Sequence, residues 1–208
     1  LKFIYKELLK KPEIISKIKS QKTSKKLPLY LTKEEIDKLL AEAKNPKHRL
    51  LIALMLSSGL RVSECLNLKI NDINLQEKTI HVKSGKGDKE RITILSQGVI
   101  EDIKKYLAER KHHSEYLFSK KSGRPLTPKL AQKILPLLTK KAGIQKKVTP
   151  HVLRNTFATL LLDSGTDLRL IQELLGHYNL NNTQNAYISK EQIKAIKNPL
   201  NTVSSRQG

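Results

Sequence analysis

Cysteine and tryptophan are almost absent from this 208-residue sequence, which has one cysteine, Cys65, and no tryptophan. A single thiol cannot form an internal disulfide, and a zinc cluster built on cysteines needs several. Cys65 follows an apolar run of residues, so we expect a buried structural thiol. We also expect a reducing, cytoplasmic setting for the protein.

Aromatic residues and long hydrophobic runs are also scarce. Aromatic residues make up 4% of the chain, which leaves few side chains for stacking on unpaired bases and disfavours an RNA-binding protein. A membrane-spanning helix needs about 20 apolar residues in succession, and the apolar run at residues 50–56 is far shorter. We therefore expect a buried helix at this run and no membrane partner.

Acidic residues are half as frequent as basic ones. The chain has 40 Lys and Arg against 19 Asp and Glu, a formal charge of +21 and a pI near 10.0. So large a positive field points to nucleic acid as the partner. The alternative is a solvated, lysine-rich surface, which accounts for many of the scattered lysines.

Two helices are predicted in the first third of the chain. Thr32 and Glu35 form a capping-box pattern at the start of residues 31–43. Residues 48–57 are apolar on nearly every side, which is typical of a central buried helix. Gly59 should end this second helix.

Arg61 follows that helix end, and Ser63 should cap a short helix that carries Glu64. An arginine in such a place is usually a structural ion-pair partner, here of Glu64. The functional alternative is a phosphate clamp, because a guanidinium group matches phosphate oxygens bidentately. On residue type alone the ion pair is favoured.

Residues 79–82 and 91–95 alternate like two strands joined by a glycine-rich hairpin connection. Residues 116–118 are a candidate third strand. Three lysines should lie near the hairpin tip, either solvated or entering a DNA groove: Lys83, Lys86 and Lys89. Helices should follow at residues 96–107 and 127–142, the second kinked at Pro136. Its lysines could track a DNA backbone: Lys129, Lys133, Lys140 and Lys141.

The stretch from Thr149 to Tyr187 concentrates side chains suited to phosphate chemistry. Thr149 and Pro150 should begin a helix whose first backbone N–H groups favour an anion. Four residues of the stretch carry candidate chemistry: His151, Arg154, His177 and Tyr187. A guanidinium keeps its charge, an imidazole exchanges protons near neutral pH, and a phenolate is a nucleophile.

Further helices are expected over residues 168–175 and 190–197. The core side of the first should be formed by Leu168, Ile171, Leu174 and Leu175, and Gly176 should end it. Ser189 and Gln192 form a capping-box pattern at the start of the last helix, which could dock on its own domain or on that of a neighbouring protomer.

Four motifs in this order resemble the tyrosine recombinases, most of all the Xer-type and phage-integrase-like members. The motifs are G-L-R-V-S-E around Arg61, G-K-G-D-K-E-R around Lys86, T-P-H-V-L-R-N-T-F-A-T from Thr149 and I-Q-E-L-L-G-H before Tyr187. The resemblance runs from about residue 27 to residue 199. It implies a mainly α fold with a small antiparallel β-sheet, the catalytic-domain fold of that family.

The resemblance also implies a mechanism of DNA strand exchange. Arg61 and Arg154 would hold the scissile phosphate, with His177 hydrogen-bonded to it, and would stabilise the transition state. His151 would assist proton transfer from Tyr187, which attacks to give a 3′-phosphotyrosyl link. Lys86, or as runner-up Lys89, would protonate the leaving 5′ oxygen. No metal or cofactor is implied, because the covalent link conserves the bond energy. The implied partners are double-stranded DNA with a specific site and a homotetramer assembled through the last helix.

Three features depart from the family pattern. The family tyrosine lies nine residues after the third-motif histidine, whereas Tyr187 lies ten after it, and ungapped counting reaches Ala186. Either a small loop shift restores Tyr187, which we favour over Tyr178, or the nucleophile is altered. Asn155 stands where many members have histidine. The third departure is the apparent absence of the upstream core-binding domain.

We accordingly expect three segments. Residues 1–26 would be a remnant helix of a core-binding domain with a basic linker, residues 27–199 the catalytic domain, and residues 200–208 a flexible tail. The favoured function is site-specific recombination, either Xer-like dimer resolution or mobile-element integration. The alternatives are a DNA-binding module without cleavage activity and a type IB topoisomerase-like relaxing enzyme.

Overall fold

The computed structural model describes residues 29–83, 90–176 and 189–202. Several predicted features lie outside these described residues. They are the expected helix and linker at residues 1–26, the two hairpin lysines Lys86 and Lys89, the third-motif His177, and the tyrosine candidates Tyr178 and Tyr187.

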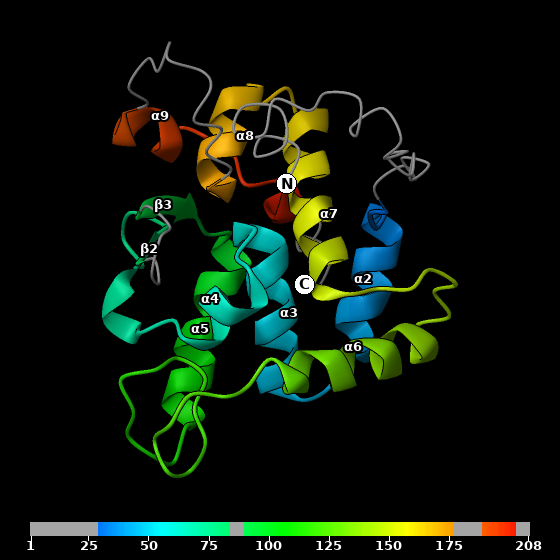
Figure 1. The fold of residues 1–208 in the computed structure, drawn as a ribbon, viewed down its shortest axis with the longest axis vertical. Helices are drawn as coiled ribbons and strands as arrows, with labels where there is room; N and C mark the ends of the chain where they lie inside the picture. The colour runs from blue at the N-terminus through cyan, green and yellow to red at the C-terminus, as the bar shows by residue number, and fades with distance from the viewer. Residues whose placement is uncertain (1–28, 84–89, 177–188, 203–208) are drawn as a thin grey trace, which may run out of the picture.

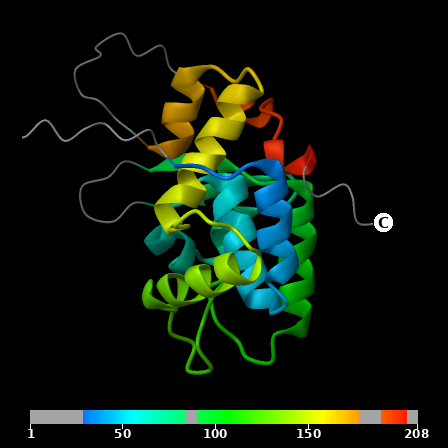
Figure 2. The same cartoon turned by 90° about the vertical axis from the view of Figure 1, so that its right-hand side faces the viewer.

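The described chain is mainly helical, as predicted. Its helices are α2 (Lys33–Glu42), α3 (Pro46–Ser58), α4 (Val62–Leu66), α5 (Gln97–Glu109), α6 (Lys129–Lys141), α7 (Pro150–Asp163), α8 (Leu168–Leu175) and α9 (Lys190–Lys194), with short 3₁₀ turns η2 (Ile70–Asp72) and η3 (Pro199–Thr202). Helix α3 lies in the middle and packs against α5 and α7 (Figure 1). Figure 2 shows α8 (orange) at one end of the molecule and the loop of residues 110–128 (green) at the other.

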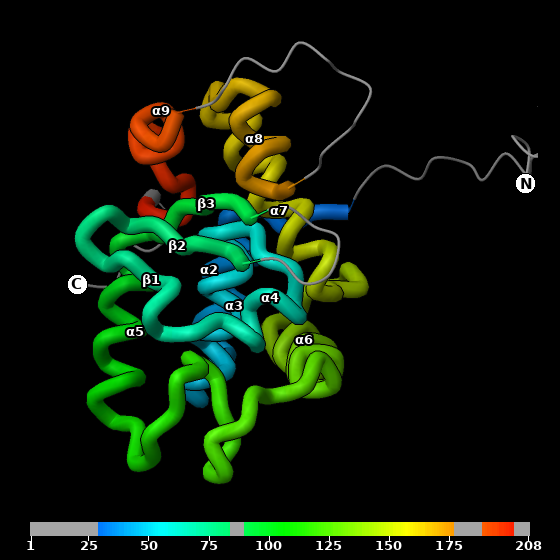
Figure 3. Tube along the Cα trace, turned by 60° about the vertical axis from the view of Figure 1, so that its left-hand side comes forward, coloured from blue at the N-terminus to red at the C-terminus, as the bar shows by residue number. Residues whose placement is uncertain are grey.

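The predicted antiparallel sheet is present, but its third strand is not the predicted one. Strands β1 (Ile73–Asn74), β2 (Thr79–Val82) and β3 (Arg91–Ile94) pair in the order β1-β2-β3. Tyr116 forms only an isolated bridge with Lys69. Strand β1 has two residues, too few to show alternation, which explains why the sequence did not reveal it. Strand β3 lies between β2 and the helices α8 and α9 (Figure 3).

Most helix ends follow the local signals in the sequence. The Thr32–Glu35 and Ser189–Gln192 capping boxes are both formed. The Thr149 hydroxyl accepts a hydrogen bond from the Val152 N–H at the start of α7. Such caps satisfy backbone N–H groups that have no partner inside the helix. The predicted helix starts are therefore confirmed at these positions.

Three local predictions were wrong. The N-cap of α4 is Arg61 rather than Ser63, because the Glu64 carboxylate reaches back to the Arg61 N–H (2.7 Å). Leu168 is 56% exposed, since it lies at the first position of α8, before the buried face begins. Leu200 is 1% exposed and η3 packs on α3 and α7, so residues 200–202 belong to the domain and not to a tail.

The apolar residues form two clusters. The large cluster fills the space among α2, α3, α5 and α6 and one face of α7, and it includes Leu54. The small cluster lies against β3 and the other face of α7. Its members are Ile94, Phe157, Leu161, Ile171, Leu174, Leu175 and Ile193. Helix α7 thus separates the two clusters.

Cys65 is fully buried, as predicted, and burial raises the pKa of its thiol. In the described ranges, no helix is both long and apolar enough to cross a membrane.

Candidate active site

The structure describes three of the predicted site residues: Arg61, His151 and Arg154. Arg61 precedes α4, and its side chain is 38% exposed. His151 and Arg154 are the second and fifth residues of α7, but His151 is exposed whereas Arg154 is buried. The helix therefore presents the histidine to solvent and turns the arginine inward.

Glu64 brings the arginines together. Its Oε1 accepts hydrogen bonds from Arg61 Nη1 and Arg91 Nη1, each at 2.9 Å. Its Oε2 accepts one from Arg91 Nη2 at 2.7 Å and lies 3.9 Å from Arg154 Nη1. The predicted Arg61–Glu64 ion pair is thus confirmed, as part of a larger group. We call Glu64 and these three arginines the arginine cluster.

Burial of the Glu64 carboxyl acts to raise its pKa, but the hydrogen bonds from Arg91 and from the Arg61 N–H outweigh burial. The pKa of Glu64 is therefore lower than usual, and the carboxylate stays ionised near neutral pH. Glu64 thus gathers three guanidinium groups beside a partly exposed surface. Guanidinium groups bind phosphate oxygens through paired hydrogen bonds, so this grouping suits a phosphate.

Arg154 is fixed by backbone carbonyls as well as by Glu64. Its Nη1 donates to the Gly59 carbonyl at 2.6 Å, and its Nη2 donates to the Leu175 carbonyl. These carbonyls lie at the C-terminal ends of α3 and α8, where they have no partner inside the helix. The guanidinium therefore joins two helix ends and satisfies both.

The end of α3 is held by side chains from several elements. The carbonyls of residues 57, 58 and 59 accept hydrogen bonds from Asn198 (2.7 Å), Thr93 (2.7 Å) and Arg154 (2.6 Å) respectively. These donors come from the C-terminal segment, β3 and α7. The backbone that leads into Arg61 is consequently fixed from several sides.

Gly59 is required at this junction for two reasons. Its φ of 62° is in the left-handed region, which disfavours a side chain. A Cβ atom there would also lie 2.3 Å from Cδ1 of Phe157, a buried ring of the small cluster. The close approach of α3 to α7 thus depends on this glycine.

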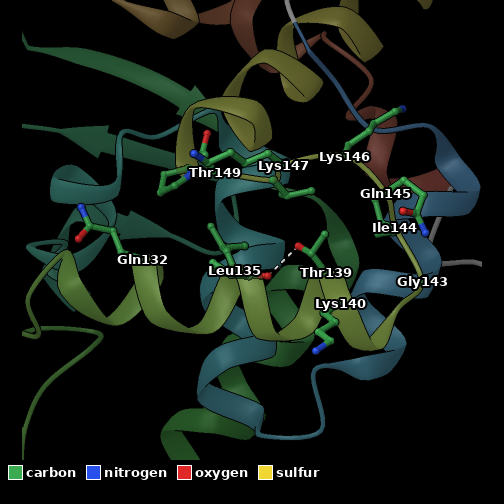
Figure 4. A pocket seen from close by; sticks show the side chains of 13 residues that line it. Gln132, Leu135, Thr139, Lys140, Gly143, Ile144, Gln145, Lys146, Lys147 and Thr149 are labelled. Atoms are coloured by element: carbon green, nitrogen blue, oxygen red, sulfur yellow. Dashed lines mark hydrogen bonds between the residues drawn. The ribbon is translucent and has the colours of Figure 1, made fainter.

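A pocket of about 470 Å³ lies beside the start of α7, apart from the arginine cluster. Helix α6 lines one side of it and the segment of residues 143–150 lines the other (Figure 4). On the α6 side, the Thr139 hydroxyl donates to the Leu135 carbonyl at 2.7 Å. Several of its lining residues are lysines: Lys140, Lys146 and Lys147.

Within the described ranges, no group of three or more His, Cys, Asp or Glu residues could hold a metal ion. The His112 ring contacts the Ser119 hydroxyl at 2.9 Å.

Comparison with known proteins now identifies the family. Residues 29–193, most of the chain, match the phage integrase family. The chain belongs to this family. The described part of the match contains Arg61, His151 and Arg154 within the motifs that suggested the resemblance.

Named relatives and solved structures agree with this assignment. The chain is 44% identical to tyrosine recombinase XerA of Pyrococcus horikoshii, over 81% of this chain and 59% of that protein. A crystal structure of XerA recombinase superposes with a TM-score of 0.69 at 37% identity, over 81% of this chain and 64% of that one. A post-cleavage complex of XerH with its palindromic difH substrate gives a TM-score of 0.66 at 35% identity, over 77% and 50%. The chain spans about three fifths of the length of the curated relatives it matches.

Arg91 is the member of the cluster that the sequence reasoning missed, although it ends the G-K-G-D-K-E-R motif. The alternation of β3 gave no signal for it, because alternation predicts Ile92 and Ile94 on the core face and Arg91 and Thr93 on the other face. Both faces of β3 are covered in the structure, so Arg91 and Thr93 are buried as well as Ile94.

Proposed function

We propose that this chain is the catalytic domain of a site-specific tyrosine recombinase, which cuts and rejoins DNA through a 3′-phosphotyrosyl intermediate. The observation that carries the proposal is the arginine cluster, in which Glu64 orients Arg61 and Arg154 inside a member of the phage integrase family. The relatives that match the chain are named tyrosine recombinases, and XerH was solved with its difH substrate.

The chemistry follows from the charges. A phosphodiester that is attacked at phosphorus gains negative charge on its non-bridging oxygens, and fixed guanidinium groups stabilise that charge without reorganising. Arg154 is held rigidly by two carbonyls, and Arg61 is the more exposed of the pair. We infer that Arg61 and Arg154 bind the non-bridging oxygens.

The remaining roles are assigned by the resemblance. The Tyr187 oxygen bonds to phosphorus while the bond from phosphorus to the 5′ oxygen breaks. His151 accepts the phenol proton, Lys86 gives a proton to the 5′ oxygen, and His177 donates a hydrogen bond to the phosphate. Attack by a 5′ hydroxyl from a partner strand then releases the tyrosine and joins the new strand. The exposed position of His151 at the start of α7 leaves it accessible to such a substrate.

A nicked-duplex assay tests the proposal. The target duplex is first selected from a randomised library by binding to this chain, and nicks are then placed along it so that the released strand end diffuses away. Wild-type protein should give a covalent protein–DNA adduct on a denaturing gel. Tyr187→Phe should abolish the adduct, whereas the control Tyr178→Phe should retain it.

Other outcomes of this assay would favour a different nucleophile or a different function. An adduct that persists in Tyr187→Phe would reassign the nucleophile, which peptide mapping of the adduct would locate. Site-selective binding without any adduct would favour the binding-only alternative. Relaxation of any supercoiled plasmid, with no dependence on the selected site, would favour the topoisomerase-like alternative.

We further propose cytoplasmic action on chromosomal or mobile-element sites by a homotetramer on two duplexes, assembled through the C-terminal segment. In the structure Ile193 of α9 is buried in the small cluster, and Lys194 pairs with Glu77 at 2.6 Å. Docking on a neighbouring protomer would therefore require α9 to leave this cluster. Truncation before Ser189 should weaken assembly on DNA in gel filtration, and unchanged assembly would disprove this role.

A further inference from the structure

Arg91 is a buried arginine with every type of guanidinium nitrogen engaged. Its side chain is 3% exposed. Nη1 and Nη2 bind the two Glu64 oxygens in a bidentate pair, and Nε donates to the Leu174 carbonyl at 2.9 Å. The side chain therefore lies inside the protein and joins two parts of it.

The two parts that Arg91 joins are both next to the predicted phosphate-binding arginines. The Glu64 carboxylate accepts hydrogen bonds from the Arg61 guanidinium and from the Arg61 backbone N–H. Leu174, whose carbonyl accepts a hydrogen bond from Arg91, is followed by Leu175, whose carbonyl accepts one from Arg154 Nη2. Arg91 and Arg154 thus bind successive carbonyls at the C-terminal end of α8, where the helix dipole favours cations.

The backbone around Arg91 is fitted to this position. Gly176 ends α8 with a φ of 67°, and a Cβ atom there would lie 3.1 Å from Arg91 Cδ and 3.2 Å from its Nη1. Arg91 also pairs with Val82 in the sheet, so its backbone is anchored by β2. The side chain is consequently held at its base, its middle and its tip.

We propose that Arg91 is a positioning residue, which holds Glu64 and the end of α8 at a fixed separation and thereby sets where the Arg61 and Arg154 guanidinium groups lie. The proposal rests on the proposed function in so far as those groups bind phosphate. Without Arg91, Glu64 would keep two guanidinium partners and draw them toward itself. Lysine cannot replace Arg91, because a single ammonium lacks the planar fork that binds both oxygens and the carbonyl.

The test compares Arg91→Lys with the matched control Arg110→Lys. Arg110 also donates from Nη1 and Nη2 to backbone carbonyls, of Tyr116 (2.8 Å) and Ser114 (3.0 Å). It lies at the end of α5, on an element that contributes nothing to the arginine cluster. Both changes keep the charge and remove guanidinium hydrogen bonds to backbone carbonyls, and Arg91→Lys also disrupts the pair with Glu64.

Arg91→Lys should slow single-turnover adduct formation on the selected nicked duplex about 100-fold, because small misplacements of binding groups cost this much. DNA affinity should stay unchanged, and Arg110→Lys should cleave like wild type. The acid limb of the rate–pH profile should move to higher pH in Arg91→Lys, since the Arg91 hydrogen bonds lower the pKa of Glu64. The Glu64→Gln, Arg91→Lys double variant should be no slower than the slower single variant, because both act through one carboxylate.

A spectroscopic readout separates this proposal from the proposed function. The Arg61 Nε–Hε resonance should shift in Arg91→Lys and stay in place in Arg110→Lys. If wild-type protein forms no adduct, the recombinase proposal fails, and this resonance alone decides the role of Arg91. A wild-type rate or an unshifted resonance in Arg91→Lys would overturn the positioning role. Equal slowing by the two lysine variants would reduce Arg91 to a structural residue.

Discussion

The two apolar clusters of this domain differ in what they support. The large cluster is built mostly from α2, α3, α5 and α6, none of which contributes a side chain to the arginine cluster. The small cluster is built from α7, α8, α9 and β3, and its helix α8 ends at two carbonyls that Arg91 and Arg154 bind. We infer that the large cluster mainly determines stability, whereas the small cluster determines the geometry of the site.

The largest expected effect comes from Leu54→Ala in the large cluster, compared with Leu174→Ala in the small one. Both side chains are 0% exposed. Leu54→Ala should lower the free energy of unfolding by about 4 kcal/mol and Leu174→Ala by about 3 kcal/mol in urea titrations, because each leaves a cavity. Leu174→Ala alone should slow adduct formation in the folded protein. If both variants slow adduct formation equally when compared at the same fraction of folded protein, the proposed division of roles between the two clusters is wrong.

A change at the junction of the clusters should be next in size. Gly59→Ala adds a Cβ in a left-handed backbone conformation, directly against Phe157. We expect a loss of about 3 kcal/mol from backbone strain and overpacking together. Gly123→Ala is the control, since its φ is 78° but the nearest atom to an added Cβ is 3.8 Å away. The difference between the two variants in thermal unfolding isolates the contact with Phe157.

Glu64→Gln should cost about 1–2 kcal/mol near neutral pH, since the carboxylate is only partly buried and its ion pairs are partly screened. The pKa of Glu64 is lower in the folded chain than its ordinary value of 4.5. Its stabilising effect is therefore present above that value and is lost as pH falls through the folded pKa. The stability gap between wild type and Glu64→Gln should close on acidification. A gap that stays constant from pH 7 to about pH 3 would show that Glu64 acts without its charge.

The smallest effect is expected at the surface, for Lys194→Met. Lys194 pairs with Glu77 at 2.6 Å, but both side chains are well exposed. Exposed ion pairs contribute about 0.2–1 kcal/mol, so the free energy of unfolding should fall by less than about 1 kcal/mol. A larger loss would mean that the small cluster needs this contact to retain α9.

The sequence predicted most reliably those features in which a hydrogen bond joins residues that are close together along the chain. The capping boxes at Thr32 and Ser189, the Thr149 cap and the left-handed ends at Gly59 and Gly176 are all readable from residues within about four positions. The Arg61–Glu64 pair belongs to the same class, because its members are three residues apart. Strand β1 was missed because two residues carry too little periodicity. The exposure of Leu168 was missed because this residue fits the apolar spacing of α8 but lies at its first position, before the buried face begins.

The sequence by itself determined the order of the elements, the ends of most helices and the presence of Arg61, His151 and Arg154 in recognisable motifs. Only the tertiary structure decided which groups meet. Arg91 is 27 residues from Glu64 and 83 from Leu174, and Arg154 is 95 from Gly59. Contacts over such separations depend on how α3, α7, α8 and β3 pack around Phe157 and its neighbours. Local patterns specify an element, but close packing between elements fixes the distances that the chemistry of the site requires.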